Sequence, residues 1–331
     1  MAEPRKLRHD VDAALRVCDL YKTFGRGAKT TEALRGLSFE VPRGSVVSLL
    51  GANGAGKTTL VNIASTLLLP TSGTVAVCGT DVVADPATVR RHISLTGQFA
   101  AVDGELTGRE NLIFFASLQG LGKAAARTRA DELLHAFRLV DAANRRVATY
   151  SGGMRRRLDI AASLTVRPDL LFLDEPTTGL DPLARRELWD AVDDLRDQGV
   201  SVLLTTQYLD EAERLSDGIV LLRGGRAVAQ GTPGELRRQF GAPVCRLGFG
   251  DAETATRCAS EFLPLALGRA CADFRVESVE VLFAAHDGVR DLSRAAEWLD
   301  SSGIEVVWAS LNPPSLDDVF LGTAFAAAQD G

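Results

Sequence analysis

Residues 51–59 read Gly51-Ala52-Asn53-Gly54-Ala55-Gly56-Lys57-Thr58-Thr59. An apolar, β-branched run at residues 46–50 comes directly before this stretch, and an apolar helical pattern at residues 60–64 follows it. A strand, a glycine-rich turn and a helix in this order are typical of a loop that binds phosphate, because backbone N–H groups and the helix N-terminus point at the anion. We therefore predict a phosphate-binding loop, in which Lys57 reaches the terminal phosphates and Thr58 ligates Mg²⁺.

The composition is that of a soluble globular protein with more than one domain. The chain has 331 residues, of which 46% are hydrophobic and 24% are charged. This length exceeds what one hydrophobic core usually organises, so we expect a large domain and a smaller one. The sequence lacks an apolar run of the roughly 20 residues that a membrane-spanning helix needs. Residues 1–12 lack the apolar stretch of a secretory signal, and we expect a short disordered tail there.

Cysteine content and net charge disfavour disulfide-bonded, zinc-binding and nucleic-acid-binding proteins. The five cysteines are odd in number and include no Cys-x-x-Cys pair. This pattern favours reduced thiols in the cytosol over a disulfide framework or a zinc site. The net charge of -6 provides no general attraction for nucleic acid.

Polar side chains follow the carboxyl ends of two predicted buried strands. Residues 92–96 form one strand, which leads to Gln98, and residues 170–173 form another, which leads to Asp174 and Glu175. Ligands of open parallel sheets bind at this edge, so Gln98 is placed to reach the metal or the attacking water. Asp174 can hold Mg²⁺ directly or through its water shell, and Glu175 can take a proton from water that attacks the γ-phosphate.

A helical insertion is predicted at about residues 99–165, where apolar residues recur at three- and four-residue spacing. Within it, Ser151-Gly152-Gly153 opens a helix. Ser151 is a suitable N-cap, and the two glycines leave backbone N–H groups available to an anion.

The flanking strands supply further candidates. Residues 14–20 and 34–41 form two strands joined by a polar hairpin loop, and Phe24 follows the first of them, where an aromatic ring can stack on a nucleotide base. Tyr21 is the alternative for this contact. A later buried strand at residues 200–205 leads to Gln207 at the same edge as Asp174.

The C-terminal residues 242–331 form a second predicted domain. Their pattern indicates the order β-α-β-β-α-β, with strands at 244–249, 274–279, 280–284 and 304–311 and helices at 252–262 and 289–299. This order suggests a small α+β, ferredoxin-like domain. We find no catalytic constellation in it, and its expected role is accessory: dimer stabilisation, regulation or none.

These motifs together resemble the nucleotide-binding subunit of ABC transporters over roughly residues 12–240. The family's order and separations are met by five motifs: residues 51–59, Gln98, Ser151-Gly152-Gly153, Asp174-Glu175 and Gly179-Leu180-Asp181. A narrower likeness, to the daunorubicin-resistance type of exporter ATPase, rests on residues 150–154, 205–209 and 314–321.

The resemblance implies a fold and a set of roles. The fold is a P-loop NTPase core of α/β type with an antiparallel β subdomain and an inserted helical subdomain, over residues 13–241. The implied substrate is ATP and the implied cofactor is Mg²⁺, served by Thr58, Gln98 and Asp174. Phe24 would stack on the adenine. Glu175 would be the general base, with Lys57 and Gln207 assisting catalysis.

Partners and location also follow from the resemblance. Ser151 and Gly153 would contact the γ-phosphate bound by a second copy of the chain in a head-to-tail dimer. A separately encoded integral membrane permease would choose the cargo, a hydrophobic drug or lipid-like compound. The chain would then be a peripheral protein on the cytoplasmic face of the cell membrane, involved in antibiotic resistance, with no nucleic-acid partner.

Two positions depart from the family pattern. Met154 stands where the family usually has glutamine, and Gln207 stands where it has the switch histidine. Glutamine can donate one hydrogen bond to a γ-phosphate but cannot become a cation, so we expect slow hydrolysis in which Glu175 matters more than Gln207.

Two other functions stay open at this point. A nucleic-acid-associated ABC ATPase is disfavoured by the single phosphate loop and by the short separation of Gln98 and Ser151. A regulatory ATP-binding module without turnover is disfavoured by the presence of Glu175.

Overall fold

The computed structural model describes residues 13–25, 29–97, 101–240 and 243–312, and the predicted tail at residues 1–12 lies outside these ranges. The chain divides into two compact units, Met1–Thr232 and Pro233–Gly331. This division assigns helix α8 (Pro233–Phe240) to the second unit, whereas the sequence places the domain boundary after residue 241.

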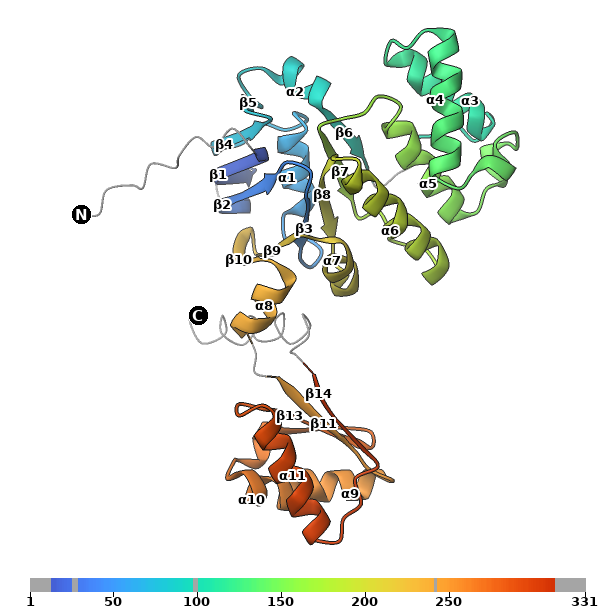
Figure 1. Cartoon of the computed structure of the whole chain (residues 1–331). Helices are drawn as coiled ribbons and strands as arrows, with labels where there is room; N and C mark the ends of the chain where they lie inside the picture. Colours follow the sequence, from blue (N-terminus) through green and yellow to red (C-terminus); the bar gives the residue numbers. More distant parts are fainter. Residues whose placement is uncertain (1–12, 26–28, 98–100, 241–242, 313–331) are drawn as a thin grey trace, which may run out of the picture. The chain divides into compact units, whose positions relative to one another are not determined.

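A six-stranded sheet forms the centre of the first unit, in the order β10-β9-β3-β8-β7-β6 (Figure 1). The strands are β3 (Val46–Leu50), β6 (Ile93–Thr96), β7 (Leu170–Asp174), β8 (Ser201–Thr206), β9 (Gly218–Arg223) and β10 (Arg226–Gly231). All neighbours pair in parallel except β9 and β10. Every residue of β3, β7 and β8 is buried, as expected for central parallel strands covered on both faces.

A second, antiparallel sheet has the order β2-β1-β4-β5. Its strands are β1 (Ala13–Phe24), β2 (Thr31–Pro42), β4 (Ser72–Val77) and β5 (Thr80–Asp81). The hairpin of β1 and β2 continues to the pair Phe24 and Thr31, beyond the strand limits that the sequence predicts. Helix α1 (Lys57–Ala64) contributes to a hydrophobic core that also includes side chains from both sheets, such as Leu15 and Phe172.

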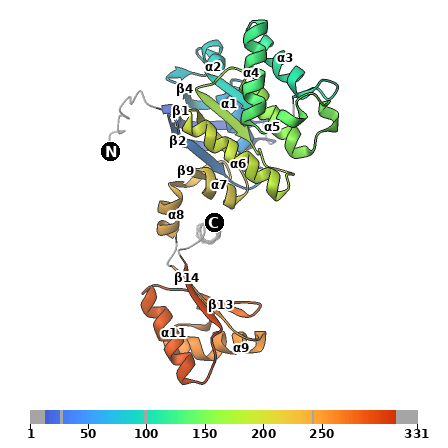
Figure 2. The same cartoon turned by 45° about the vertical axis from the view of Figure 1, so that its right-hand side comes forward.

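Helices α3 (Gly108–Leu118), α4 (Lys123–Ala136) and α5 (Gly152–Ser163) form the predicted insertion, and they group beside the sheet in Figures 1 and 2. A capping box of Thr107 and Glu110 begins α3. Helices α6 (Pro182–Asp197) and α7 (Leu209–Leu215) follow β7 and β8. The prediction that a strand begins at His92 is wrong, because His92 is the last residue of α2 (Pro86–His92), whose N-cap is Asp85.

The second unit holds a four-stranded antiparallel sheet in the order β12-β13-β11-β14. Besides α8 and the short 3₁₀ helix η4 (Cys271–Asp273), the elements of this unit are β11 (Val244–Gly248), α9 (Ala252–Arg257), the π-helix η3 (Cys258–Phe262), α10 (Leu263–Leu267), β12 (Phe274–Glu277), β13 (Glu280–Ala284), α11 (Val289–Ser301) and β14 (Trp308–Asn312). The order β-α-β-β-α-β is present when α9, η3 and α10 are taken as one helical segment. The assignment to a ferredoxin-like domain and its accessory role stay predictions.

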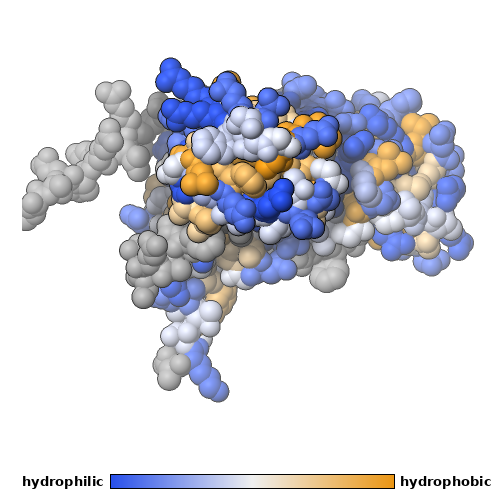
Figure 3. All heavy atoms as spheres, turned by 90° about the horizontal axis from the view of Figure 1, so that it is seen from below, coloured by the Kyte–Doolittle hydropathy of each residue, from blue (hydrophilic) through white to orange (hydrophobic). Residues whose placement is uncertain are grey.

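This unit has its own core, which includes Leu247, Phe283 and Leu299. The last strand begins only at Trp308, four residues later than the sequence predicts. Apolar side chains also reach the surface among polar ones, as Figure 3 shows. The large exposed apolar side chains of the described part of this unit are Leu265, Val276, Val289, Trp298, Val307 and Trp308.

Candidate nucleotide site

The glycine-rich turn joins β3 to α1 in a conformation that requires glycine. Gly54 and Gly56 have φ angles of 80° and 109°, in the left-handed region. A Cβ on Gly51 would lie 2.4 Å from the carbonyl oxygen of Leu222, so the turn also packs closely against its neighbour. Gly56 is the N-cap of α1 and offers no side-chain cap, which leaves N–H groups of the first turn available to an anion.

Lys57 is held by the turn that precedes it. Its side chain is only 4% exposed, and Nζ donates to the carbonyl oxygens of Gly51 at 2.7 Å and Ala52 at 3.3 Å. The same ammonium lies 3.2 Å from Oε1 of Glu175. The structure therefore brings together the predicted phosphate-binding lysine and the predicted general base as a buried ion pair.

Asp174 lies between two hydroxyl groups. Thr58 Oγ1 donates to Asp174 Oδ2 at 3.0 Å, and Thr205 Oγ1 donates to Asp174 Oδ1 at 2.5 Å. A threonine hydroxyl beside a carboxylate is an all-oxygen donor set of the kind that Mg²⁺ prefers. The predicted metal ligands Thr58 and Asp174 thus lie together and fit that cation.

Glu175 has an unusual backbone conformation. Its φ angle is 47°, which is uncommon for a residue with a side chain and costs on the order of 1–3 kcal/mol. The Glu175 N–H donates to the carbonyl oxygen of Thr205 at 3.1 Å and to its Oγ1 at 3.0 Å. Thr205 therefore fixes both acidic residues at the end of β7.

A cavity of about 290 Å³ lies beside Lys57, Thr58 and Glu175. Its lining consists of Ala33, Asn53, Gly54, Gly56, Lys57, Thr58, Thr59 and Glu175. Strand β8 pairs with both β3 and β7, and its last residue, Thr206, lies opposite Leu50. Gln207 is next in the chain, so its backbone lies at the same edge, between the ends of β3 and β7.

The Ser151 segment is not part of this cavity. Ser151 is the N-cap of α5 and its hydroxyl accepts from the N–H of Met154 at 3.2 Å, as the sequence predicts. Ser151 and Gly152 are exposed, whereas Gly153 is buried against α6, where an added Cβ would lie 2.5 Å from Cβ of Ala184. At the N-terminus of α5, Ser151 and Gly152 are thus accessible to a partner molecule, while Gly153 is packed against α6.

The two aromatic candidates for stacking on the nucleotide base, Phe24 and Tyr21, differ in their surroundings. Phe24 and Tyr21 are both 42% exposed. Lys22 Nζ lies 4.9 Å from the centre of the Phe24 ring, and the Tyr21 hydroxyl lies close to Gly36 of the neighbouring strand. The choice between them stays a prediction in favour of Phe24. Gln98 and residues 314–321 lie outside the described ranges.

Sequence reasoning missed Thr205 and Arg156. Arg156 on α5 is 9% exposed and donates to the carbonyl oxygens of Gly97 at 2.6 Å, Pro176 at 3.0 Å and Asp174 at 3.2 Å. Burial lowers the pKa of its guanidinium. The available signals were the position of Thr205 at the ligand-binding end of β8 and that of Arg156 five residues after Ser151.

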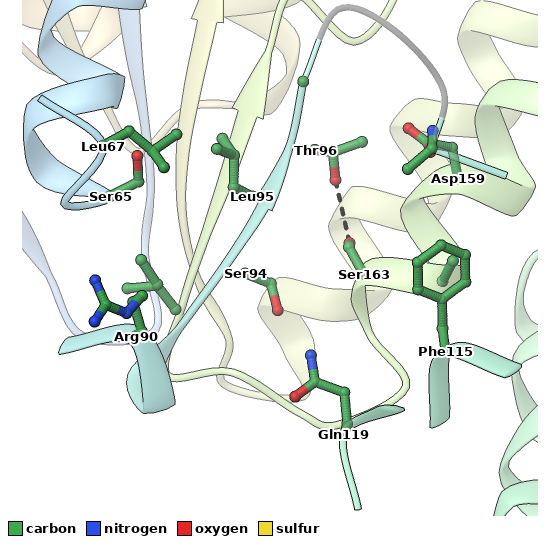
Figure 4. A pocket seen from close by; sticks show the side chains of 14 residues that line it. Ser65, Leu67, Arg90, Ser94, Leu95, Thr96, Phe115, Gln119, Asp159 and Ser163 are labelled. Atoms are coloured by element: carbon green, nitrogen blue, oxygen red, sulfur yellow. Dashed lines mark hydrogen bonds between the residues drawn. The ribbon is translucent and has the colours of Figure 1, made fainter. Parts of the chain in front are cut away.

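A second cavity, of about 350 Å³, lies between the helical insertion and the sheet (Figure 4). Phe115 and Gln119 line it from the end of α3, and Asp159 and Ser163 line it from α5. Thr96 Oγ1 donates to Ser163 Oγ at 3.1 Å across its wall. Burial raises the pKa of Asp159, whose side chain accepts from the N–H of Ala101.

Comparison with known proteins identifies the family. A family model described as ABC transporter matches residues 34–178. The chain is 47% identical over 315 residues to the doxorubicin resistance ATP-binding protein DrrA of Mycobacterium tuberculosis (strain ATCC 25618 / H37Rv), which covers 95% of this chain and 94% of that protein. The chain belongs to the ABC transporter ATP-binding proteins of the doxorubicin and daunorubicin resistance type. As a member of this family, it is an ABC exporter ATPase.

Other relatives agree with this assignment of the exporter ATPase. This chain is 50% identical to the daunorubicin/doxorubicin resistance ATP-binding protein DrrA of Streptomyces peucetius over 300 residues, which are 91% of this chain and 90% of that one. It is 39% identical to a Nod factor export ATP-binding protein I of Ralstonia nicotianae (strain ATCC BAA-1114 / GMI1000), over 86% of this chain and 87% of the relative. The family therefore confirms the predicted exporter ATPase and does not favour the nucleic-acid-associated or regulatory alternatives.

Solved structures confirm the fold of the exporter ATPase. One ATP-binding subunit of an ABC transporter matches with a TM-score of 0.60 and 35% identity, over 69% of this chain and 93% of that one. A dimeric ATP-binding cassette in a post-hydrolysis state, bound to ADP and Pi, matches with a TM-score of 0.60 and 25% identity. The match covers 66% of this chain and 98% of that one. In the described part of the chain, none of the helices combines the length and apolarity needed to cross a bilayer.

Proposed function

We propose that this exporter ATPase powers the efflux of a hydrophobic drug or lipid-like compound through a separately encoded membrane permease. In this proposal the chain binds as a peripheral subunit on the cytoplasmic side of the membrane. The single observation that carries the catalytic part is the gathering of Lys57, Thr58 and Glu175 at one cavity, with Asp174 hydrogen-bonded to Thr58 behind it. The names of the relatives, which are doxorubicin and daunorubicin/doxorubicin resistance ATP-binding proteins, support the choice of cargo.

The phosphates of ATP would bind the N–H groups of residues 51–59 and the ammonium of Lys57. Mg²⁺, held by Thr58 and Asp174 with Gln98 as a further proposed ligand, would neutralise charge on the phosphate oxygens. One hydrogen bond from Thr205 and one from Thr58 hold the Asp174 carboxylate in place.

Glu175 is the proposed general base. In the structure the carboxylate of Glu175 forms an ion pair with Lys57. A phosphate that binds the ammonium of Lys57 would replace Glu175 in this pair and leave its carboxylate available. The freed carboxylate can then accept a proton from water that attacks the γ-phosphate. Since the backbone of Glu175 is fixed by Thr205, the side chain needs only a rotamer change to exchange partners.

A second copy would complete the site. The start of α5, where Ser151 and Gly152 are exposed, would add a further hydroxyl and further N–H groups to those that line the cavity around Lys57. The dimeric cassette bound to ADP and Pi among the structural relatives supports a dimeric active form. Gln207 would add one hydrogen bond to the γ-phosphate.

The permease would bind at the cavity shown in Figure 4. Its walls include Phe115 on α3 and Gly97, which precedes the segment of Gln98. Arg156 binds the carbonyl oxygen of Gly97 and that of Asp174, so contact at this cavity acts on groups that reach the nucleotide site.

The catalytic proposal is tested with Glu175→Gln. We expect steady-state ATPase activity to fall by at least about a hundredfold while ATP binding is kept, because general-base catalysis contributes about 10²–10⁴. Glu105→Gln, at an exposed surface pair with Arg146, is the control and should hydrolyse normally. Wild-type turnover in the Glu175→Gln protein would overturn the assignment.

The transport proposal is tested by expression with a neighbouring membrane protein in a drug-sensitive host. We expect copurification of the two chains and ATP-dependent doxorubicin efflux. Phe115→Ala should weaken both while the isolated chain keeps its ATPase activity. Phe114→Ala is the matched control, because Phe114 is the exposed neighbour on α3 outside the cavity lining. Efflux that is independent of the ATPase would contradict the proposal.

A further inference from the structure

Three side chains of metal-binding types meet at the edge of the sheet away from the nucleotide site. Cys78 follows β4 of the antiparallel sheet, His92 ends α2 just before β6, and Asp169 directly precedes β7. Strands β6 and β7 are parallel, so their amino ends lie together here while the carboxyl end of β7 carries Asp174 and Glu175. The cluster is therefore separate from the groups that serve ATP.

Distances within the cluster are close to those of a metal site. One ligand atom from each of Cys78, His92 and Asp169 lies within 4.8 Å of the other two, and His92 Nδ1 lies 2.6 Å from Asp169 Oδ2. Tetrahedral zinc bonds of about 2.0–2.3 Å place neighbouring ligand atoms roughly 3.3–3.6 Å apart. Side-chain movements of about 1 Å thus convert the present arrangement into a three-ligand set.

We propose that Cys78, His92 and Asp169 bind one Zn²⁺ ion, with a water molecule as the fourth ligand. A thiolate, an imidazole and a carboxylate are all established zinc ligands, and three protein ligands with an open position leave room for solvent. Asp169 is exposed and Cys78 and His92 are half-buried, so the ion can enter from solvent.

Backbone contacts position the three ligands. The N–H of Asp169 donates to the carbonyl oxygen of His92 at 2.9 Å, which fixes these two residues beside each other. The N–H of Cys78 donates to the carbonyl oxygen of Ala14 in β1 at 3.0 Å. A shared ion would therefore join the antiparallel sheet to the parallel sheet.

Arg43 is the charged neighbour of the cluster. Its Nη1 lies 3.6 Å from Asp169 Oδ1, so it holds the oxygen that His92 does not contact. The charges of a thiolate and a carboxylate balance those of Zn²⁺, which leaves the guanidinium as an outer partner of a neutral site. The absence of a Cys-x-x-Cys pair in the sequence disfavours a zinc site, whereas here the fold assembles three residues that are distant in the chain.

The test uses the full chain, free of nucleotide and treated with chelator, and Co²⁺ as a spectroscopic substitute for zinc. We expect one equivalent to bind with a thiolate-to-cobalt charge-transfer band, and Zn²⁺ to displace it. The band should disappear in Cys78→Ser. His92→Ala and Asp169→Asn should weaken binding by at least about tenfold, as changes even to outer-shell partners of a metal do. Cys271→Ser, which changes an exposed thiol elsewhere, should bind like the wild type.

A second measurement guards against misfolded variants. Zn²⁺ should raise the Tm of the wild-type chain and of Cys271→Ser, and it should leave the Tm of a folded Cys78→Ser chain unchanged. Burial raises the pKa of the Cys78 thiol, so binding should release protons and strengthen with pH. A charge-transfer band retained by Cys78→Ser, or zinc stabilisation that persists in that variant, would overturn the proposal. Absence of a stoichiometric cobalt complex in the wild type would also overturn it.

Discussion

At the scale of single residues, the site depends on side chains that hold the reacting groups. Thr205 is the clearest case, because its hydroxyl contacts Asp174 Oδ1 and its backbone and side-chain oxygens both accept from the N–H of Glu175. A residue that touches neither phosphate nor metal in the proposed mechanism thus positions two residues that do.

Thr205→Val tests this role. The substitution keeps the shape and leaves the buried Asp174 oxygen without its partner, which costs about 1–3 kcal/mol. If about 1.4 kcal/mol of this appears in the transition state, the ATPase rate falls roughly tenfold. Turnover of Thr74→Val, at an exposed position on β4, should stay normal. Equal rates for the two variants would remove Thr205 from the positioning role.

Glu211 is a buried carboxyl group next to the nucleotide edge. It is 0% exposed, Trp189 Nε1 donates to its Oε1 at 3.2 Å, and burial raises its pKa despite the nearby Arg185. A raised pKa in the folded state means that the stabilising contribution is complete below the unfolded value of about 4.3 and is lost as the pH rises through the folded value.

Glu211→Gln should therefore change the pH dependence of stability. The neutral amide avoids the cost of burying a charge, so the variant should match the wild type in acid and gain in relative Tm as the pH rises toward neutrality. Thermal unfolding at several pH values measures this difference. Glu297→Gln, at an exposed position on α11, should show the same profile as the wild type. A Tm difference that does not vary with pH would contradict the argument.

At the scale of elements, the two adjacent glycines at the start of α5 differ in their packing, while the contact of Gly153 with a γ-phosphate stays a prediction. Gly153 is buried and an added Cβ would meet Ala184 at 2.5 Å, whereas an added Cβ on Gly152 meets nothing within 4 Å. One glycine is required by the contact of α5 with α6, and the other is free to face a partner.

Alanine substitutions of Gly153 and Gly152 should affect different properties, stability in the first case and dimerisation with turnover in the second. Gly153→Ala overpacks the contact and should lower the free energy of unfolding by about 1–3 kcal/mol. Gly152→Ala should leave the free energy of unfolding unchanged or slightly raised but reduce ATP-dependent dimerisation and turnover. Urea denaturation and ATPase assays on both variants measure the two effects. Destabilisation by Gly152→Ala would show that its surroundings are packed.

At the scale of the whole molecule, the proposed active form contains two copies. Glu175→Gln with MgATP should accumulate as a dimer, because ATP binds at the interface and is not hydrolysed. Light scattering after size exclusion measures the mass. Adding Ser151→Arg should keep this variant monomeric. Adding Arg186→Ser instead, at an exposed position on α6, should leave the dimer intact. A monomer at saturating MgATP would contradict the head-to-tail proposal.

Local patterns predicted much of this molecule. The apolar runs of β3, β7 and β8 and the glycine-rich turn determine their structure within a few residues, so the sheet and the phosphate loop were predicted correctly. The contacts of Arg156 and Thr205 join residues far apart in the chain and leave no periodic signal. His92 was misassigned because the N-cap at Asp85 begins a short helix that overrides the strand propensity of the following residues.

Arg156 has one further consequence for the whole chain. Its rigid, planar guanidinium bridges the strand end at Gly97, the acidic strand end at Asp174 and the turn at Pro176. Because these three segments share hydrogen bonds with the one planar guanidinium of Arg156, they have little freedom to shift independently. We therefore expect a displacement of the helical insertion to move these three segments together, with Arg156 as the side chain that couples them.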